Sequence, residues 1–181
     1  MSFISITGPM SRSIYGLARA MAWFGGAVLS LIALVSVASI IGRALNGLGL
    51  TPVPGDFELV EAGTALAVFC FLPWAHLRRG HAWVDLFWPY YPAAVRYALV
   101  ILADALMLGC WVLLVWRMGI GMADYRENGE VSFILQMPVW WGIAASYPFA
   151  VAGCVTYLWR LLEDLGLAKA PEALGPAGGT H

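Results

Sequence analysis

The sequence predicts an all-α integral membrane protein with four transmembrane helices, with the N-terminus and the C-terminus both on the cytoplasmic side. Of its 181 residues, 61% are hydrophobic and only 12% are charged, and the mean hydropathy is +0.76. Soluble domains are roughly half apolar and carry about twice that share of charged residues. Four apolar stretches each approach the roughly 20 residues that cross a bilayer. The net charge of -1 provides no basic footprint, so no nucleic-acid partner is expected.

The chain divides into three parts along its length. Residues 1–19 are predicted to be a cytoplasmic or interfacial N-terminal segment that forms a short helix on the membrane surface. Residues 20–164 are predicted to form the four-helix membrane domain. Residues 165–181 are small, polar and rich in Pro and Gly, which predicts a disordered cytoplasmic tail.

The first two spans are predicted at about residues 20–43 and 57–77. The first is an uncharged run that ends at Arg43 and is longer than the core of a signal peptide, so it is predicted to be a retained helix. The second reaches a spanning length only if Glu58 and Glu61 occupy its first turns. Acidic residues there are favoured by the helix dipole. The loop before them is rich in Gly and Pro and predicts a short irregular link.

The connection after the second span is rich in charged and aromatic residues. Arg79 and His81 make it basic where it leaves the span, and Asp85 follows His81 by four residues. Trp and Tyr rings settle at the level of lipid headgroups, so this segment is predicted to lie along the interface as a short amphipathic element. The aromatic residues assigned to the lipid interface, here and at the start of the fourth span, are Trp83, Trp88, Tyr90, Trp140 and Trp141.

The third and fourth spans are predicted at about residues 97–117 and 137–160. The third contains one acid, Asp104, at about 10 Å inside the helix at about 1.5 Å per residue, so this side chain is not expected to face lipid. Small residues recur at helical spacing along the fourth and predict a stripe for close helix packing. They are Gly142, Ser146, Ala150 and Gly153.

Basic residues set the predicted orientation. With a cytoplasmic N-terminus, seven of the ten Lys and Arg residues fall on the cytoplasmic side and three on the other. The three are Arg43, Arg117 and Arg126. Because cytoplasmic loops carry the excess of positive charge, this distribution predicts that both termini are cytoplasmic.

Arg43 closes the first span, and Glu58 and Glu61 open the second on the same side of the membrane. An ion pair between these helices is therefore available. A structural pair is favoured over a substrate or ion site, since a site for a transported anion would need Arg43 without a counter-charge.

Asp104 suggests a proton relay, but a relay needs a series of ionisable groups, and only His76 is expected at a similar depth. A hydrogen bond within the bundle or to a partner subunit is favoured instead. His76 and His81 lie five residues apart near one helix exit and the other spans contain no His, which argues against a bis-His haem. No catalytic, phosphate-binding or metal-ligand spacing is present, so neither an enzyme nor a cofactor is expected.

Several short motifs follow one another between residues 42 and 148. They are Gly42-Arg43 closing the first span, Glu58 opening the second, Arg79-Gly80-His81 with Val84-Asp85, the run LQMPVWW at residues 135–141, and Tyr147-Pro148. In order, spacing and four-helix topology, the chain resembles the small membrane subunit, the Q component, of tripartite ATP-independent periplasmic (TRAP) transporters.

The resemblance implies a non-catalytic role in the bacterial inner membrane. In such systems a periplasmic substrate-binding protein captures an organic acid, and a large multispanning subunit imports it with a sodium gradient. The small subunit would brace the large one, so the expected partners are these two proteins and membrane lipids. The residues expected to organise the bundle or its contact with the large subunit are Arg43, Glu58, Glu61, Asp104, Arg79, His81 and Asp85.

Two other classes of function remain open from the sequence. The chain could be the membrane anchor of a respiratory complex, against which the scarcity of His within the spans argues. It could also be a self-sufficient small transporter, in which Asp104 would have to carry the coupling.

Overall fold

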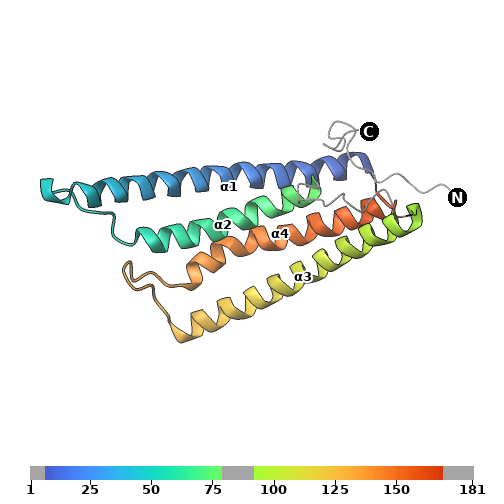
Figure 1. Cartoon of the computed structure of the whole chain (residues 1–181). Coiled ribbons are helices and arrows are strands. Elements are labelled where there is room, and N and C mark those ends of the chain that lie inside the picture. Colours follow the sequence, from blue (N-terminus) through green and yellow to red (C-terminus); the bar gives the residue numbers. More distant parts are fainter. Residues whose placement is uncertain (1–6, 79–91, 169–181) are drawn as a thin grey trace.

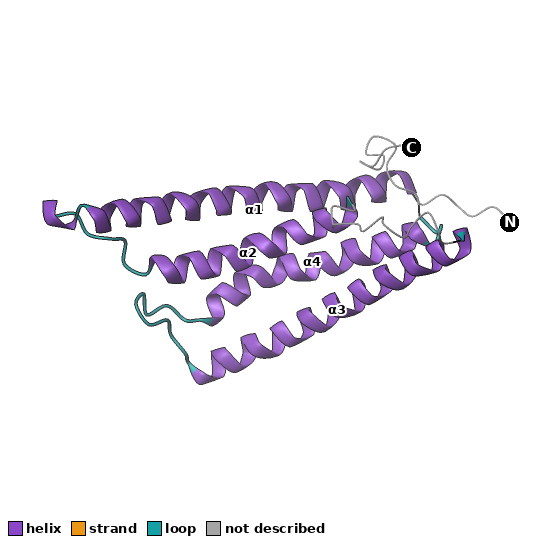
Figure 2. Ribbon diagram, viewed as in Figure 1, coloured by secondary structure: helices purple, strands orange, loops and turns teal. Residues whose placement is uncertain are grey.

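Four long helices form the chain in a computed structural model, which describes residues 7–78 and 92–168 (Figures 1 and 2). Each helix is long and apolar enough to cross a membrane. The predicted all-α fold with four membrane-spanning helices is therefore confirmed. The helices are α1 (Thr7–Ala44), α2 (Asp56–Leu77), α3 (Ala93–Asn128) and α4 (Trp140–Asp164), and a short 3-10 helix, η1 (Asn46–Leu48), follows α1.

The helices lie side by side in a row in the order α1, α2, α4, α3 (Figure 1). Helix α2 packs between α1 and α4, and α4 packs between α2 and α3. We call the end of the row where α2 begins the Glu58 end, and the end where α2 finishes the His76 end. A row leaves both of its broad faces open to lipid or to another protein.

Helix α1 is continuous from Thr7, so the prediction of a separate surface helix in the N-terminal segment is wrong. The physical reason is the packing of this first part of α1 at the His76 end. Ile14, Tyr15 and Ala18 are buried there in a cluster with Leu77 of α2 and Trp159 of α4. Because these apolar side chains have partners within the protein, the segment continues α1 instead of forming a separate helix.

Close approach of α1 and α2 depends on glycine. A Cβ atom on Gly25 would lie 2.7 Å from Cβ of Cys70, and one on Gly63 would lie 2.9 Å from Cγ2 of Ile32. Between membrane helices, where lipid tails are as apolar as the side chains, close van der Waals packing supplies much of the attraction. The α1–α2 contact is therefore a small-residue interface.

One tryptophan of α3 packs closely against α4. The indole of Trp111 occupies the space above Gly153, where an added Cβ would lie 2.5 Å from the ring. Its Nε1–H donates a hydrogen bond of 2.8 Å to the carbonyl oxygen of Ala150, and its ring stacks on Tyr157 with 4.7 Å between centroids. The predicted small-residue stripe on α4 thus receives a large side chain from α3.

Several boundaries in the second half of the chain differ from the expected ones. Helix α3 runs to Asn128, well past the expected end near residue 117, and stops at Gly129, whose φ of 65° ends the helix. Helix α4 begins only at Trp140, because Pro138 forms a β-bridge with Val131 in the preceding loop. After α4, residues 165–168 form a hydrogen-bonded turn instead of the start of a disordered tail, and residues 169–181 lie outside the described part.

Candidate functional site

The charged residues at the Glu58 end pair differently from the prediction. Arg43 forms its ion pair with Asp56, at 3.3 Å between Nη2 and Oδ2, and not with Glu58 or Glu61. Ser39, one helical turn before Arg43, donates a hydrogen bond of 2.6 Å to the same Oδ2 atom. Asp56 is the first residue of α2 and directly faces the last turns of α1, which explains why it is the partner.

Glu58 binds the loop between α3 and α4. Its carboxylate accepts hydrogen bonds from Ser132 Oγ at 2.8 Å, from the backbone N–H of Ile134 at 2.6 Å and from that of Leu135 at 2.9 Å. A carboxylate that accepts several backbone N–H groups makes strong, charge-assisted contacts. We call Glu58 with Ser132, Ile134 and Leu135 the Glu58 clamp.

Local backbone geometry supports the clamp. Gly55, the residue before α2, has a φ of 71°, and the side chain of Leu135 lies where a Cβ of that residue would be. Within the loop, Ser132 N–H donates to Met137 O at 2.7 Å, and Val139 N–H donates to Glu130 O at 3.0 Å. The loop is therefore a compact hairpin fixed to the start of α2.

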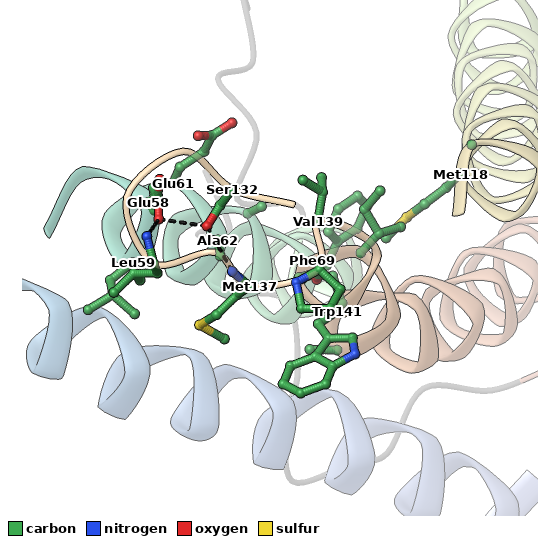
Figure 3. Close-up of a pocket in the computed structure, with 18 of the residues that line it drawn as sticks. Glu58, Leu59, Glu61, Ala62, Phe69, Met118, Ser132, Met137, Val139 and Trp141 are labelled. Carbon is green, nitrogen blue, oxygen red and sulfur yellow. Dashed lines mark hydrogen bonds between the residues drawn. The ribbon is translucent and has the colours of Figure 1, made fainter. Parts of the chain in front are cut away.

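A groove with a volume of about 860 Å³ lies below the clamp (Figure 3). Helices α2 and α3 form its walls, α4 forms its floor, and the hairpin loop closes it at the Glu58 end. Small side chains line much of α2 and α4 here, among them Ala62, Ala65, Gly142 and Ser146. The groove forms because α3 packs mainly on α4 and meets α2 at only a few side chains, such as Trp111 with Phe69 and Asp104 with His76.

Glu61 and Arg117 lie on opposite walls of this groove. Both residues are exposed, and neither makes a hydrogen bond or an ion pair with another residue of the described ranges. Glu61 was expected near Arg43 or a partner subunit, and the structure instead places it with Ala62 and Ala65 on the groove wall. Apart from Glu58, whose carboxylate is bound by the hairpin loop, the groove is therefore apolar with one charge of each sign on its two walls.

The family is decided by comparison with known proteins. Residues 32–166, which include α2, α3, α4 and the last third of α1, match the family model described as "Tripartite ATP-independent periplasmic transporters, DctQ component". The chain belongs to the DctQ family. It is a small membrane subunit of a TRAP transporter and a multi-pass membrane protein. Searches of curated proteins and of solved structures found no match.

In this DctQ chain, Asp104 and His76 meet between α3 and α2. Asp104 Oδ1 lies 3.7 Å from His76 Nε2, and the two side chains are 15% and 4% exposed. The His76 ring stacks on Tyr157 with 4.1 Å between centroids, and Tyr157 in turn stacks on Trp111. Asp104 therefore faces the interior of the bundle. Its neighbour is His76, the histidine that was predicted to lie at a similar depth in the membrane.

The remaining predicted residues divide into two groups. Trp140 and Trp141 lie in the first turn of α4, where Arg126 covers the ring of Trp140 at 5.6 Å and Trp141 lines the groove with half its surface exposed. The others lie outside the residues that the structure describes. These are Arg79, His81, Asp85, Trp83, Trp88 and Tyr90.

Sequence reasoning missed a charged cluster at the His76 end of this DctQ chain. Glu163 accepts hydrogen bonds from Tyr15 at 3.0 Å, Trp159 at 2.8 Å and Arg160 at 2.9 Å, and Arg160 also binds Asp164 at 3.2 Å. Glu163 and Arg160 are only 5% and 13% exposed. The spacing of three and four residues along α4 was the available signal. The link to α1 could not be read from the sequence.

No candidate metal site appears among the described residues. Within residues 7–78 and 92–168, no three His, Cys, Asp or Glu side chains lie close enough together to hold a metal ion.

Proposed function

We propose that this chain braces the large transport subunit of a TRAP transporter without taking part in substrate chemistry. On this proposal, the complete transporter imports an organic acid that a periplasmic protein delivers, and a sodium gradient drives the large subunit. The observation that carries the proposal is the family match over residues 32–166. The substrate-binding and ion-binding groups would then lie in the two partner proteins.

The contacts of the charged side chains in the described residues support a bracing role. Arg43 pairs with Asp56 between α1 and α2, Glu58 fixes the loop before α4, and Glu163 links α4 to α1. Each of these contacts joins elements of the chain itself. A transporter that acted alone would instead need ionisable groups arranged along a path through the membrane.

The shape of the bundle supports the same role. Four helices in a row enclose no central channel between them, whereas each broad face offers a long apolar surface to a neighbour. Large exposed side chains follow α1 and α3, including Leu31, Leu34, Leu106, Leu113 and Trp116. In a membrane these side chains contact lipid or helices of another subunit.

We also propose that the Glu58 end faces the periplasm of a bacterial inner membrane and that both termini are cytoplasmic. The excess of Lys and Arg at the His76 end and in the terminal segments supports this orientation. The hairpin loop with its exposed Phe133 and the loop after α1 would then be available to the periplasmic binding protein.

Purification of the chain from its native membrane in a mild detergent, followed by mass spectrometry of the copurified proteins, tests the function. A much larger multispanning protein in a fixed ratio is the expected result. If the chain emerges alone or only with copies of itself, the bracing proposal fails. A haem absorption spectrum in the same sample would point to a respiratory anchor, and substrate uptake by the chain alone in liposomes would point to a small transporter.

Replacing Glu58 is expected to weaken assembly of the complex. In Glu58→Ala the hairpin loop loses all three of its hydrogen bonds to α2, so the Glu58 end loses its defined shape. We expect the yield of copurified large subunit to fall about tenfold. This is the change in binding constant that the loss of one hydrogen bond to a charged group produces.

Glu127→Ala is the matched control for this change, because Glu127 is an exposed acid on α3 that forms none of these contacts. Its copurification is expected to equal that of the unchanged chain. A Glu58→Ala complex that assembles normally but binds substrate weakly would place Glu58 in a transport site and contradict the clamp.

A further inference from the structure

We infer that the groove below the Glu58 clamp binds one phospholipid with a zwitterionic headgroup that ends in a primary ammonium group. This inference goes beyond the bracing role proposed above and does not depend on it. It is carried by the distribution of charge along the groove, by the closed end of the groove and by its size.

The two charged residues of the groove that are not part of the clamp, Glu61 and Arg117, lie where the apolar parts of their helices end. Glu61 is the last acid before the uncharged stretch of α2, and Arg117 follows an uncharged stretch of α3 that begins after Asp104. Both therefore mark the place where an apolar helix surface gives way to a polar one, which is where lipid headgroups lie. Away from the Glu58 end, the walls become apolar through Ala65, Phe69 and Leu114. The groove is thus polar at one end and apolar at the other, as a phospholipid is.

The hairpin loop decides what kind of molecule can enter. The loop runs from the end of α3 to the start of α4 and is fixed to α2 by Glu58, so it crosses the gap between the two walls. A transmembrane helix would have to continue past this level and would collide with Leu135, Met137 and Pro138. A phospholipid enters sideways from the bilayer and ends at its headgroup. The closed end therefore favours a lipid over a helix of a partner protein.

Charge complementarity indicates the headgroup. A guanidinium such as that of Arg117 binds phosphate through paired hydrogen bonds, and a carboxylate such as that of Glu61 binds an ammonium group that can donate hydrogen bonds. An ethanolamine headgroup carries both partners. A choline headgroup cannot donate to Glu61, and an anionic glycerol headgroup would leave it without a cation. The volume of about 860 Å³ lies within the range of sites for molecules of this size.

Native mass spectrometry of the full purified chain tests this site. Phosphatidylethanolamine, phosphatidylcholine and phosphatidylglycerol with identical acyl chains are added in turn, and the fraction of chain that retains one lipid is measured against lipid concentration. We expect phosphatidylethanolamine to bind about tenfold more tightly than the other two, the factor that one charge-assisted hydrogen bond provides. Equal retention of the three lipids would overturn the proposal, because it would describe a nonspecific layer of lipid.

Three variants and one control locate the site. Glu61→Gln should remove the preference for ethanolamine, Arg117→Gln should weaken all three phospholipids, and Ala65→Trp should block the groove. Ala33→Trp places the same ring on an exposed position of α1 outside the groove and should change nothing.

The two conservative variants, Glu61→Gln and Arg117→Gln, keep the test decisive if Ala65→Trp does not fold. An unchanged lipid preference in Glu61→Gln, or an unchanged lipid affinity in Arg117→Gln, would overturn the assignment. Efficient crosslinking of the large subunit to Ala65→Cys in the intact complex would also overturn it, since a protein segment would then occupy the groove.

Discussion

Gly153→Leu is expected to separate α3 from α4. The Leu side chain would occupy the space of the Trp111 indole, which already lies where the first added carbon would be. Trp111 would then lose its hydrogen bond to the carbonyl oxygen of Ala150 and its stacking on Tyr157. Overpacking of this kind in a buried contact lowers the free energy of unfolding by about 3 kcal/mol.

Gly109→Leu is the matched control for Gly153→Leu, because an added Cβ on Gly109 of α3 meets no atom within 4 Å. Leu is also a better helix former than Gly by roughly 0.7 kcal/mol, so this variant should be as stable as the unchanged chain or slightly more stable. Unfolding in mixed micelles by increasing fractions of SDS, followed by tryptophan fluorescence, gives both values. Equal midpoints for the two variants would show that the Trp111 contact does not hold α3.

Glu163→Ala is expected to produce the second large loss of stability. Three donors from α1 and α4 converge on this buried carboxylate, and its removal leaves Arg160 with Asp164 alone. Removing one partner of a buried ion pair costs about 3–5 kcal/mol, and the remaining contact with Asp164 places the expected loss near the lower value. The same unfolding measurement, made on the full chain, checks the result.

Glu163→Gln separates the charge from the hydrogen bonds. The amide keeps the volume of the side chain and an oxygen that accepts from Tyr15 or Trp159, but it loses the ion pair with Arg160. We expect about half of the loss seen for Glu163→Ala, because a hydrogen bond to a charged group is roughly twice as strong as a neutral one. If Glu163→Ala unfolds at the same point as Glu127→Ala, a change on the exposed face of α3, the cluster contributes nothing to stability.

The class of the protein and the existence of its four spans follow from local properties of the sequence. In lipid there is no water to hydrogen-bond the backbone N–H and C=O groups. A single apolar segment of about 20 residues therefore crosses the bilayer as a helix, which pairs all of these groups within the segment. That is why the stretches ending near Arg43 and Leu77 were recognised without any knowledge of their neighbours. The motif order around Glu58 and Tyr147-Pro148 also pointed to the family that the comparison with known proteins then showed.

Helix boundaries were determined only in part by the sequence. A run of uncharged residues marks the apolar part of a helix, but the helical backbone can continue through charged residues until a residue such as Gly129 ends it. Helix α3 therefore runs beyond Arg117 to Asn128, and α1 extends back to Thr7 because Ile14 and Tyr15 find partners on α2 and α4. Extensions of this kind depend on contacts with residues far away in the sequence.

Partner choice was the property that the sequence left open. Arg43, Asp56, Glu58 and Glu61 were all visible as charges near two helix ends, and spacing alone favoured a pair between Arg43 and Glu58 or Glu61. The tertiary structure decided otherwise, because the rotation of α2 turns Asp56 toward α1 and Glu58 toward the hairpin loop, while Glu61 faces the groove. A step of one residue along a helix turns a side chain by about 100°, and only the packing of neighbouring helices fixes which direction faces which partner.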